Sequence, residues 1–273
     1  MTTIEWTTGL PGHTGVSWNP LAGCSKVNAA CTNCYAERMA RRLQAIGATG
    51  YDAVVNEHGH WSGKVTLLEG KLHAPLHWKK PRVVFVNSMS DLFHESVPAE
   101  FIVNVFEVMS AARQHKFIVL TKRPERIKPV LFGQEGHFYL GGDDYLGNVA
   151  LGTSVHDQAS ADAFLPHLQC WSGPRVASVE PLLCPVDLTH HLTKGHTTRY
   201  SGLDWVIVGG ESGPGARPMH PDWARAIRDQ CVVAGVPFFF KQAITDGRKI
   251  SLPTIDGEQY AEYPRAWTTQ ESR

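Results

Sequence analysis

The stretch "FIVLTKR", residues 117–123, is a short apolar run that ends in a hydroxyl group and two positive charges. Similar runs recur along the chain, and most of them are apolar at nearly every position. Strands of a parallel sheet have this composition when helices cover both faces of the sheet. The other runs are "VVFVNS" (83–88), "VALGTSV" (149–155), "RVASVEP" (175–181), "DWVIVGGES" (204–212) and "VPFFFKQ" (236–242).

Amphipathic segments between these runs predict helices, for example over residues 98–114 and 221–235. Pro221 suits the first turn of the second helix, and Gly235 suits its end. Strands that alternate with helices predict a parallel sheet with right-handed crossovers. With "GVSWN" (15–19) as an opening strand, the pattern favours a full or partial α/β barrel over an open three-layer sheet.

The strand ends carry polar side chains or glycines. In parallel α/β folds the C-terminal edge of the sheet holds the functional site, so we expect a binding site lined by polar residues there. A chain that leaves a sheet also meets water, which is a simpler reason for polar residues at any one strand end. The residues in question are Asn87, Ser88, Thr121, Lys122, Arg123, Thr153, Ser154, Glu180, Gly209, Gly210, Glu211, Lys241 and Gln242.

The whole chain, residues 1–273, is predicted to form a single domain. Residues 44–80 are rich in Gly, His and Trp, and we expect them to be an insertion that covers the barrel. Residues 243–273 are expected to be a short C-terminal extension. The Asp-Gly pairs at 246–247 and 256–257 predict hairpin turns within it.

The formal net charge is zero, because 26 Lys and Arg residues balance 26 Asp and Glu residues. The protein as a whole therefore has no strong positive electrostatic field that would attract nucleic acid. A nucleic acid would therefore have to bind to a local patch. The N-terminus has neither the basic start nor the apolar stretch of a signal peptide, and the longest apolar runs are too short to cross a bilayer. We therefore expect a cytoplasmic protein without a membrane partner.

Three cysteines lie close together in "GCSKVNAACTNCYAERMARRL", residues 23–43, with the spacing C-x6-C-x2-C. Cys24, Cys31 and Cys34 are one ligand short of a closed zinc site, which His13, His58 or His60 could complete. Three thiolates would also suit a 4Fe–4S cluster whose fourth iron stays open to a small molecule. A chance group of free thiols is the third alternative.

The cysteine loop after the first strand of a parallel α/β barrel resembles the radical S-adenosylmethionine (SAM) superfamily. The motifs "IEWT", "VFVNSMSDLFHE", "VLTKRPER", "SVEPLL", "DWVIVGGESGPGARPM" and "FFFKQ" narrow the resemblance to a phage-associated family of radical-SAM-like proteins, distantly similar to spore photoproduct lyase. Two features depart from the common C-x3-C-x2-C pattern. The first gap is six residues, and Asn33 stands where an aromatic residue is usual, with Tyr35 following.

The resemblance implies a partial (βα)6-type TIM barrel of the radical SAM kind and a protein of the phage-infected host cytoplasm. It implies that Cys24, Cys31 and Cys34 bind a 4Fe–4S cluster, that SAM chelates the fourth iron, and that a 5′-deoxyadenosyl radical abstracts a substrate hydrogen. A reducing protein such as flavodoxin would supply electrons. The substrate would be DNA or a modified thymidine nucleotide, rearranged by an isomerase of thymidine hypermodification.

On this resemblance the strand ends receive roles, each with a simpler structural alternative such as a turn, an ion pair or a solvated face. Glu211 and Lys122 join the cysteines as catalytic residues. The expected cofactor contacts are Asn87, Ser88, Asp91, Thr153, Ser154, Glu180, Gly209 and Gly210. The expected substrate contacts are Lys122, Arg123, Glu211, Arg217, Lys241 and Gln242.

A basic ring of Lys122, Arg123, Arg126, Lys241 and Arg217 could bind a phosphate backbone, and Trp61, Trp78 and His94 could add to it by stacking. The basic helix after the cysteines, with Arg38, Arg41 and Arg42, is expected to be an ordinary barrel helix.

Two other functions remain open at this point. Repair of a thymine photoproduct would need a reactive thiol near the mouth, for which Cys184 is the candidate. A zinc-stabilised nucleic-acid-binding module without catalysis would need a fourth zinc ligand beside the three cysteines.

Overall fold

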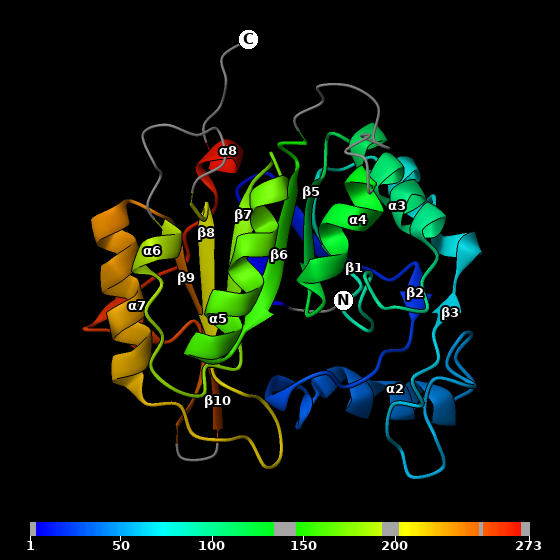
Figure 1. Cartoon of the computed structure of the whole chain (residues 1–273), viewed down its shortest axis with the longest axis horizontal. Coiled ribbons are helices and arrows are strands. Elements are labelled where there is room, and N and C mark those ends of the chain that lie inside the picture. Colours follow the sequence, from blue (N-terminus) through cyan, green and yellow to red (C-terminus); the bar gives the residue numbers. More distant parts are fainter. Residues whose placement is uncertain (1–3, 134–145, 193–201, 246–247, 269–273) are drawn as a thin grey trace.

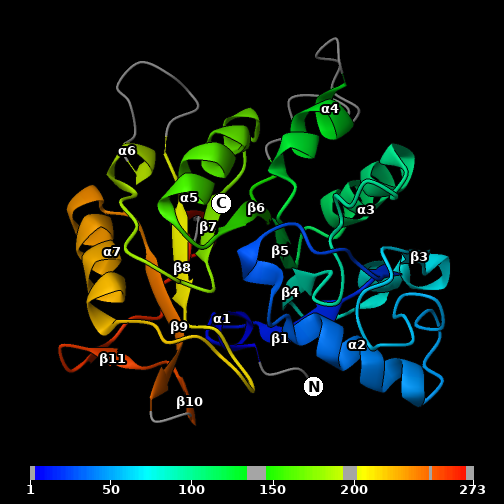
Figure 2. The same ribbon diagram turned by 60° about the horizontal axis from the view of Figure 1, so that its bottom comes forward.

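The computed structural model describes residues 4–133, 146–192, 202–245 and 248–268. It is a mixed α/β fold built on an eight-stranded sheet that curls into a half-barrel (Figures 1 and 2). In spatial order the strands are β1 (Thr14–Trp18), β4 (Arg82–Val86), β5 (Lys116–Thr121), β6 (Val149–Val155), β7 (Arg175–Val179), β8 (Trp205–Gly209), β9 (Phe238–Thr245) and β10 (Arg248–Ser251).

Within this sheet β1, β4, β5, β6, β7, β8 and β9 pair in parallel, and β10 pairs antiparallel with β9. Each strand predicted from the sequence is confirmed, with shifted ends. β4 and β5 end at Val86 and Thr121, so Asn87 and Lys122 lie just beyond the last paired residues. Because the strands are parallel, these continuations all emerge at the same edge of the sheet.

The helices predicted between strands are confirmed over α3 (Ala99–Ala111) and α7 (Pro221–Ala234). Pro221 opens α7, and Gly235 ends it in the left-handed conformation, with φ 65°. The other helices are α1 (Glu5–Thr8), α2 (Tyr35–Ala45), α4 (Ile127–Phe132), α5 (Gln158–Phe164), α6 (Thr189–Leu192) and α8 (Arg265–Thr268). The 3-10 turns are η1 (Ala29–Cys31), η2 (Glu69–Lys71), η3 (Ala74–His77), η4 (Pro124–Arg126) and η5 (Leu165–Cys170).

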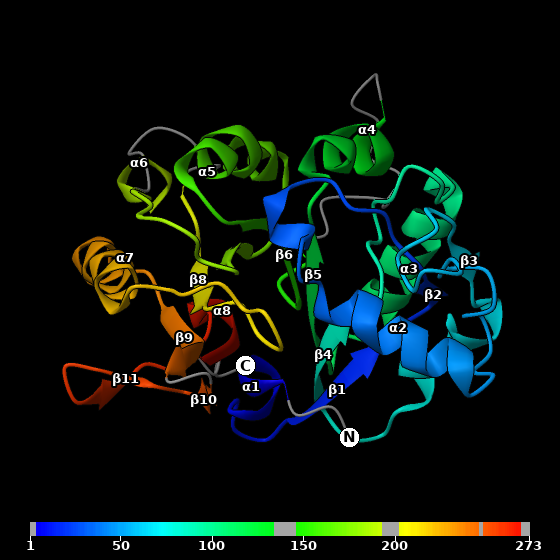
Figure 3. The same ribbon diagram turned by 90° about the horizontal axis from the view of Figure 1, so that it is seen from below.

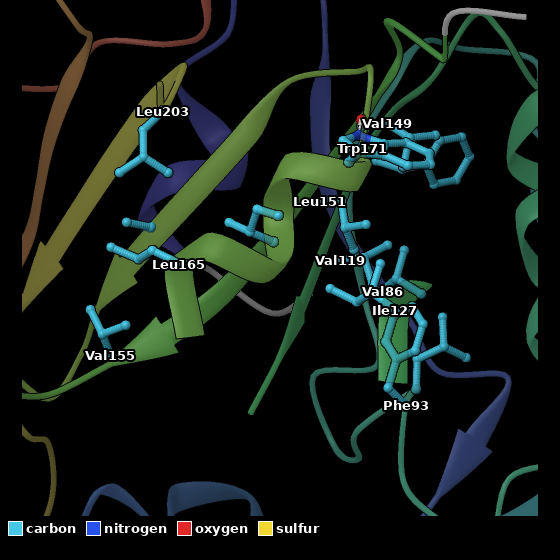
Figure 4. Close-up of a cluster of buried hydrophobic side chains, with 14 of the residues drawn as sticks. Val86, Phe93, Val119, Ile127, Val149, Leu151, Val155, Leu165, Trp171 and Leu203 are labelled. Atoms are coloured by element: carbon cyan, nitrogen blue, oxygen red, sulfur yellow. Dashed lines mark hydrogen bonds between the residues drawn. The ribbon is translucent and has the colours of Figure 1, made fainter. Parts of the chain in front are cut away.

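The main core lies between the outer face of the sheet and helices α3, α4, α5 and α7. Phe93, Ile127, Leu151 and Trp171 belong to this core and are fully buried or nearly so (Figure 4). Phe106 of α3 contacts both Phe93 and Trp171 edge to face, at centroid distances of 6.2 and 5.6 Å. Burial on this side explains why the strands are apolar at their outward positions.

A second core fills the concave side of the sheet near the N-terminal ends of the strands. Its aromatic members are Trp6, Trp205, Phe239, Tyr263 and Trp267, all at most 7% exposed. Trp6 is on α1, which contacts β1, β4 and β9 and so spans the open side of the half-barrel (Figure 3). Above this plug the concave side turns polar.

Helix α2 corrects the expectation of an ordinary barrel helix. It lies across the C-terminal edge of the sheet instead of joining the outer layer (Figures 1 and 3). Its buried face, Ala36 and Ala40, packs on Tyr51, Val54 and Trp61 of the predicted insertion in a separate core. A two-stranded ribbon, β2 (Leu21–Ala22) with β3 (Thr66–Leu67), joins this unit to the barrel.

The C-terminal extension contains the predicted hairpin at 256–257. β11 (Thr254–Ile255) pairs with β12 (Glu258–Gln259), and both turn residues have positive φ, 55° for Asp256 and 85° for Gly257. A two-residue hairpin turn of type I′ requires this conformation at both positions. The predicted turn at 246–247 lies outside the described residues.

Replacing Trp6 with Ala should lower the free energy of unfolding by about 3–5 kcal/mol, because it empties a filled site in the concave core. Trp6 is 2% exposed and contacts Phe85 at a centroid distance of 4.6 Å. Urea denaturation measures the change. Val233→Ala, at a side chain that is 91% exposed on α7, is the control and should change stability by less than about 0.5 kcal/mol. If Trp6→Ala lowered the free energy of unfolding as little as the control does, α1 would not be an essential part of the concave core.

Candidate active site at the C-terminal edge

A cavity of about 390 Å³ lies at the C-terminal edge, between the concave side of the sheet and α2. This volume is within the range of small-molecule sites. The residues of the central strands that line it change from apolar to polar toward the strand ends. The apolar positions are Phe85 and Leu120, and the polar positions are Asn87, Ser88, Thr121, Lys122, Ser154, Ser178, Glu180, Lys241 and Gln242.

The three clustered cysteines all line this cavity, and none of them forms a disulfide. Cys24 follows β2, Cys31 ends η1, and Cys34 is the N-cap residue of α2. Burial and the nearby Asp91 raise the pKa of Cys24 to about 12, and Cys34 contributes to the rise. The metal-free Cys24 is therefore a neutral thiol near pH 7, and it needs a cation to become a thiolate ligand.

The described residues contain no group of three or more His, Cys, Asp or Glu side chains that could hold a metal ion. The histidines considered as a fourth zinc ligand have other contacts. His13 lies beside the Pro11 carbonyl at 3.0 Å, His58 beside Glu57 at 3.5 Å and His60 beside Glu37 at 2.9 Å. The described residues thus show no preformed metal site of any kind. In an iron–sulfur cluster each thiolate binds a different iron, so its cysteines surround one cavity and need not contact one another.

Arg123 is a buried cation beside the cysteine loop, 4% exposed. It donates to Asp91 at 3.1 Å, to Glu95 at 2.7 Å and to the hydroxyl of Ser25 at 2.6 Å. It also reaches the Ser25 carbonyl at 3.4 Å and the Cys24 sulfur at 4.0 Å. Arg123 is thus committed to the protein itself and does not lie free in the predicted basic ring.

Asp91 organises the ends of two strands and is not a free acceptor. Its Oδ1 accepts from Phe93 N at 3.0 Å and from the Thr121 hydroxyl at 2.7 Å. Its Oδ2 accepts from Lys122 N and Arg123 Nη1, both at 3.1 Å. The carboxylate predicted to bind the cofactor therefore serves first to shape the site.

Asn87 is the site residue that most clearly lacks a partner. It is 3% exposed and lines the cavity, and neither Oδ1 nor Nδ2 has a hydrogen-bond partner among the described residues. Its backbone is left-handed, with φ 59°. A buried amide without partners is costly, so this geometry points to a ligand that both donates and accepts.

The neighbouring Ser88 and Tyr35 hold α2 over the cavity. The Tyr35 hydroxyl donates to the Ser88 carbonyl at 2.5 Å, and the Ser88 hydroxyl donates to Asn19 at 3.2 Å. Val27, Tyr35 and Met39 line the cavity yet are 42–46% exposed, so they form an apolar rim. A flat, partly apolar ligand could pack against this rim.

Glu180 forms the ion pair that the sequence left as an alternative. Its Oε1 accepts from Lys241 Nζ at 2.6 Å and from Gln242 Nε2 at 3.1 Å. Gly209 leaves space for this group, because a Cβ there would lie 3.3 Å from the Glu180 carboxyl carbon. Gly210 N donates to the Gln242 carbonyl at 2.9 Å, its own carbonyl accepts from Gln242 Nε2 at 2.8 Å, and neither glycine lines the cavity.

Glu211 and Arg217 bind each other and the cysteine loop. Glu211 is 5% exposed and accepts from Arg217 Nη2 at 2.5 Å and from Asn33 Nδ2 at 2.8 Å. Arg217 also donates to the Ala29 carbonyl at 2.9 Å. Asn33, where an aromatic residue was expected, thus connects the loop to the 211–217 segment.

Lys122 is the lining cation whose ammonium group has no hydrogen bond or ion pair with the described residues. Thr153 is out of phase with the lining positions and donates to the Thr121 carbonyl at 2.9 Å. Ser178, which the sequence analysis missed, lies opposite Ser154 in the β6–β7 register and lines the cavity beside it. Ser178 could have been predicted, because it precedes Glu180 by two residues and so faces the same side of the strand.

The remaining members of the predicted nucleic-acid patch are scattered. Arg126 donates to the Phe93 and His94 carbonyls, and His94 is 1% exposed. Trp61 lines the cavity, whereas Trp78 stacks with Arg82 at 4.7 Å and does not. Cys184, the thiol proposed for photoproduct repair, does not line the cavity either.

Residues 1–264 match a family model described as protein of unknown function (DUF5131). The chain belongs to this family. The match includes the cysteine loop and every strand of the half-barrel. Comparison with curated proteins and with solved structures gives no match. In the described part of this DUF5131 chain, no helix has the length and hydrophobicity needed to cross a membrane.

The Glu211 contacts predict an acid-sensitive contribution to stability. Despite its burial, hydrogen bonds from Arg217 and Asn33 lower the pKa of Glu211 from 4.5 to about 2. A lowered folded pKa stabilises the fold above the unfolded value, and this stabilisation is lost as the pH falls from 4.5 toward 2. The urea midpoint of Glu211→Gln should therefore be lower than wild type at pH 6, and the difference should shrink across that acid range.

The exposed Glu107→Gln, on α3, is the control and should follow wild type at each pH. A Glu211→Gln difference that did not vary with pH would show that the carboxylate charge does not stabilise the loop.

Proposed function

We propose that the chain is a radical SAM enzyme that binds a 4Fe–4S cluster through Cys24, Cys31 and Cys34. The observation that carries the proposal is the juxtaposition of three free cysteines and the unpartnered Asn87 amide around one cavity. The cavity lies at the edge where parallel barrels bind their ligands. When bound, the cluster and SAM would supply one-electron chemistry and a radical that abstracts hydrogen.

The residues of the chain would bind and orient the reactants. Asn87 would offer one acceptor and two donors to the amino-acid part of SAM. Ser154 and Ser178 would offer hydroxyls from the floor of the cavity. The Glu180–Lys241 pair would form the opposite wall, and the rim of Val27, Tyr35 and Met39 would exclude water.

The substrate we propose is an amino-acid-modified thymine in phage DNA, rearranged without change in mass. Lys122, the cavity cation without a partner, would bind an anionic group of this substrate. A base in duplex DNA would have to be flipped out to reach the cavity. A reducing protein such as flavodoxin would supply the electron.

Anaerobic purification tests the cofactor. The wild-type protein should be brown and hold about four irons, and Cys24→Ala, Cys31→Ala and Cys34→Ala should each lose most of them. Cys184→Ala, which removes a thiol outside the cavity, is the control and should keep them. Iron analysis and visible absorption make the measurement. A colourless wild-type protein with one zinc would overturn the proposal.

The substrate is tested separately with reduced, cluster-loaded enzyme, SAM and phage DNA that carries the modified thymine. Chromatography and mass spectrometry of the digested nucleosides should show a new species of unchanged mass. Formation of 5′-deoxyadenosine from SAM with every tested nucleoside left unaltered would keep the cofactor assignment and reject this substrate.

Asn87→Gly should weaken SAM binding by about tenfold, because it removes the amide while keeping a residue that tolerates positive φ. Iron content should not change. Leu252→Gly is the matched control: Leu252 also has positive φ, 47°, but does not line the cavity. Equilibrium binding of SAM makes the comparison, and equal affinities in the two variants would remove Asn87 from the ligand site.

A further inference from the structure

The guanidinium of Arg123 uses all of its N–H groups on the protein. Nε donates to Glu95, Nη1 to Asp91 and toward Cys24, and Nη2 to both oxygens of Ser25. Arginine carries five such donors in a rigid plane, so none is left for a ligand. A cation this buried is stable only when its partners surround it.

Arg123 and its partners come from three segments that are far apart in the sequence. Ser25 and Cys24 open the cysteine loop, Asp91 and Glu95 follow β4, and Arg123 follows β5. His94, 1% exposed, adds a second contact to the Ser25 hydroxyl at 2.9 Å. Arg123 thus ties the start of the loop to the carboxyl edge of the sheet.

The contacts of Arg123 hold the N-terminal end of the cysteine loop, which lies farthest from η1 and α2. The spacing places Cys31 and Cys34 within one short stretch, where η1 and the start of α2 position them. Cys24 is separated from them by a gap of six residues, of which η1 orders only the end. On its N-terminal side Cys24 follows Gly23, which forms a β-bridge to Ser90, and on its C-terminal side Arg123 holds the chain through Ser25.

We infer that Arg123 is the positioning residue of Cys24, holding its thiol and the adjoining Ser25 against Asp91 and Glu95 through a planar set of hydrogen bonds and not through charge alone. Lysine carries the same charge but cannot form this planar set of contacts. Arg123 therefore serves the cysteine loop and does not bind the substrate or a phosphate backbone.

Alkylation of the reduced, metal-free full-length chain tests this without relying on the proposed function. Iodoacetamide is added under anaerobic conditions, and peptide mass spectrometry gives the rate at each cysteine. In Arg123→Lys and Arg123→Gln, Cys24 should react about tenfold faster relative to Cys34, because its half-buried thiol loses the contacts that hold it in place. Ser25→Ala, a milder change, should give a smaller increase of about threefold.

Arg126→Gln is the matched control, because Arg126 lies on the same turn but donates to backbone carbonyls of 93, 94 and 97. It should leave the Cys24 rate at the wild-type value. Wild-type reactivity in both Arg123→Lys and Ser25→Ala would overturn the inference. So would a slower rate in Arg123→Gln with a normal rate in Arg123→Lys, since that pattern indicates charge alone.

A second measurement rests on the proposed function. Hydrogen bonds to the sulfur ligands raise the reduction potential of an iron–sulfur cluster. The loaded Arg123→Lys protein should therefore have a lower midpoint potential than wild type, whereas Arg126→Gln should not. Iron-free protein in every variant would count against the cluster and leave the alkylation result valid, while an unchanged potential in loaded Arg123→Lys would contradict the contact to Cys24.

Discussion

The parallel direction of β1 to β9 is the constraint on which the site depends. It sends the ends of all these strands to one edge, so that residues far apart in the sequence meet around a single cavity. The aromatic core that α1 and α8 form with β8 and β9 fills the other end of the concave side. Among the described residues, polar side chains line the concave side at the edge where the cysteine loop lies.

The apolar runs and their polar ends were sufficient to predict the strands, the parallel sheet and the edge at which the cavity lies. The pattern is strong because strands covered on both faces need apolar side chains at almost every position. Even Ser178 could have been found, since it alternates with Glu180 on the concave face. The hairpin at 256–257 was predictable for a local reason, because Asp-Gly favours positive φ.

The contacts of the site residues could not be predicted in the same way. Nothing near Arg123 in the sequence indicates Ser25 as its partner, and nothing near Glu211 indicates Asn33. Such pairs depend on where loops meet after folding. The position of α2 has the same origin: its polar and apolar faces are typical of a barrel helix, but the insertion supplies its partner surface.

The antiparallel strand β10 has a consequence for association between molecules. Among the described residues it pairs only with β9, so its other side is a free sheet edge. All four of its residues are exposed, and they include Arg248 and Lys249. Lys249 pairs with Glu5 at 2.7 Å, so Arg248 carries the positive charge that a strand from a second copy would meet, and short, charged edges of this kind oppose aggregation.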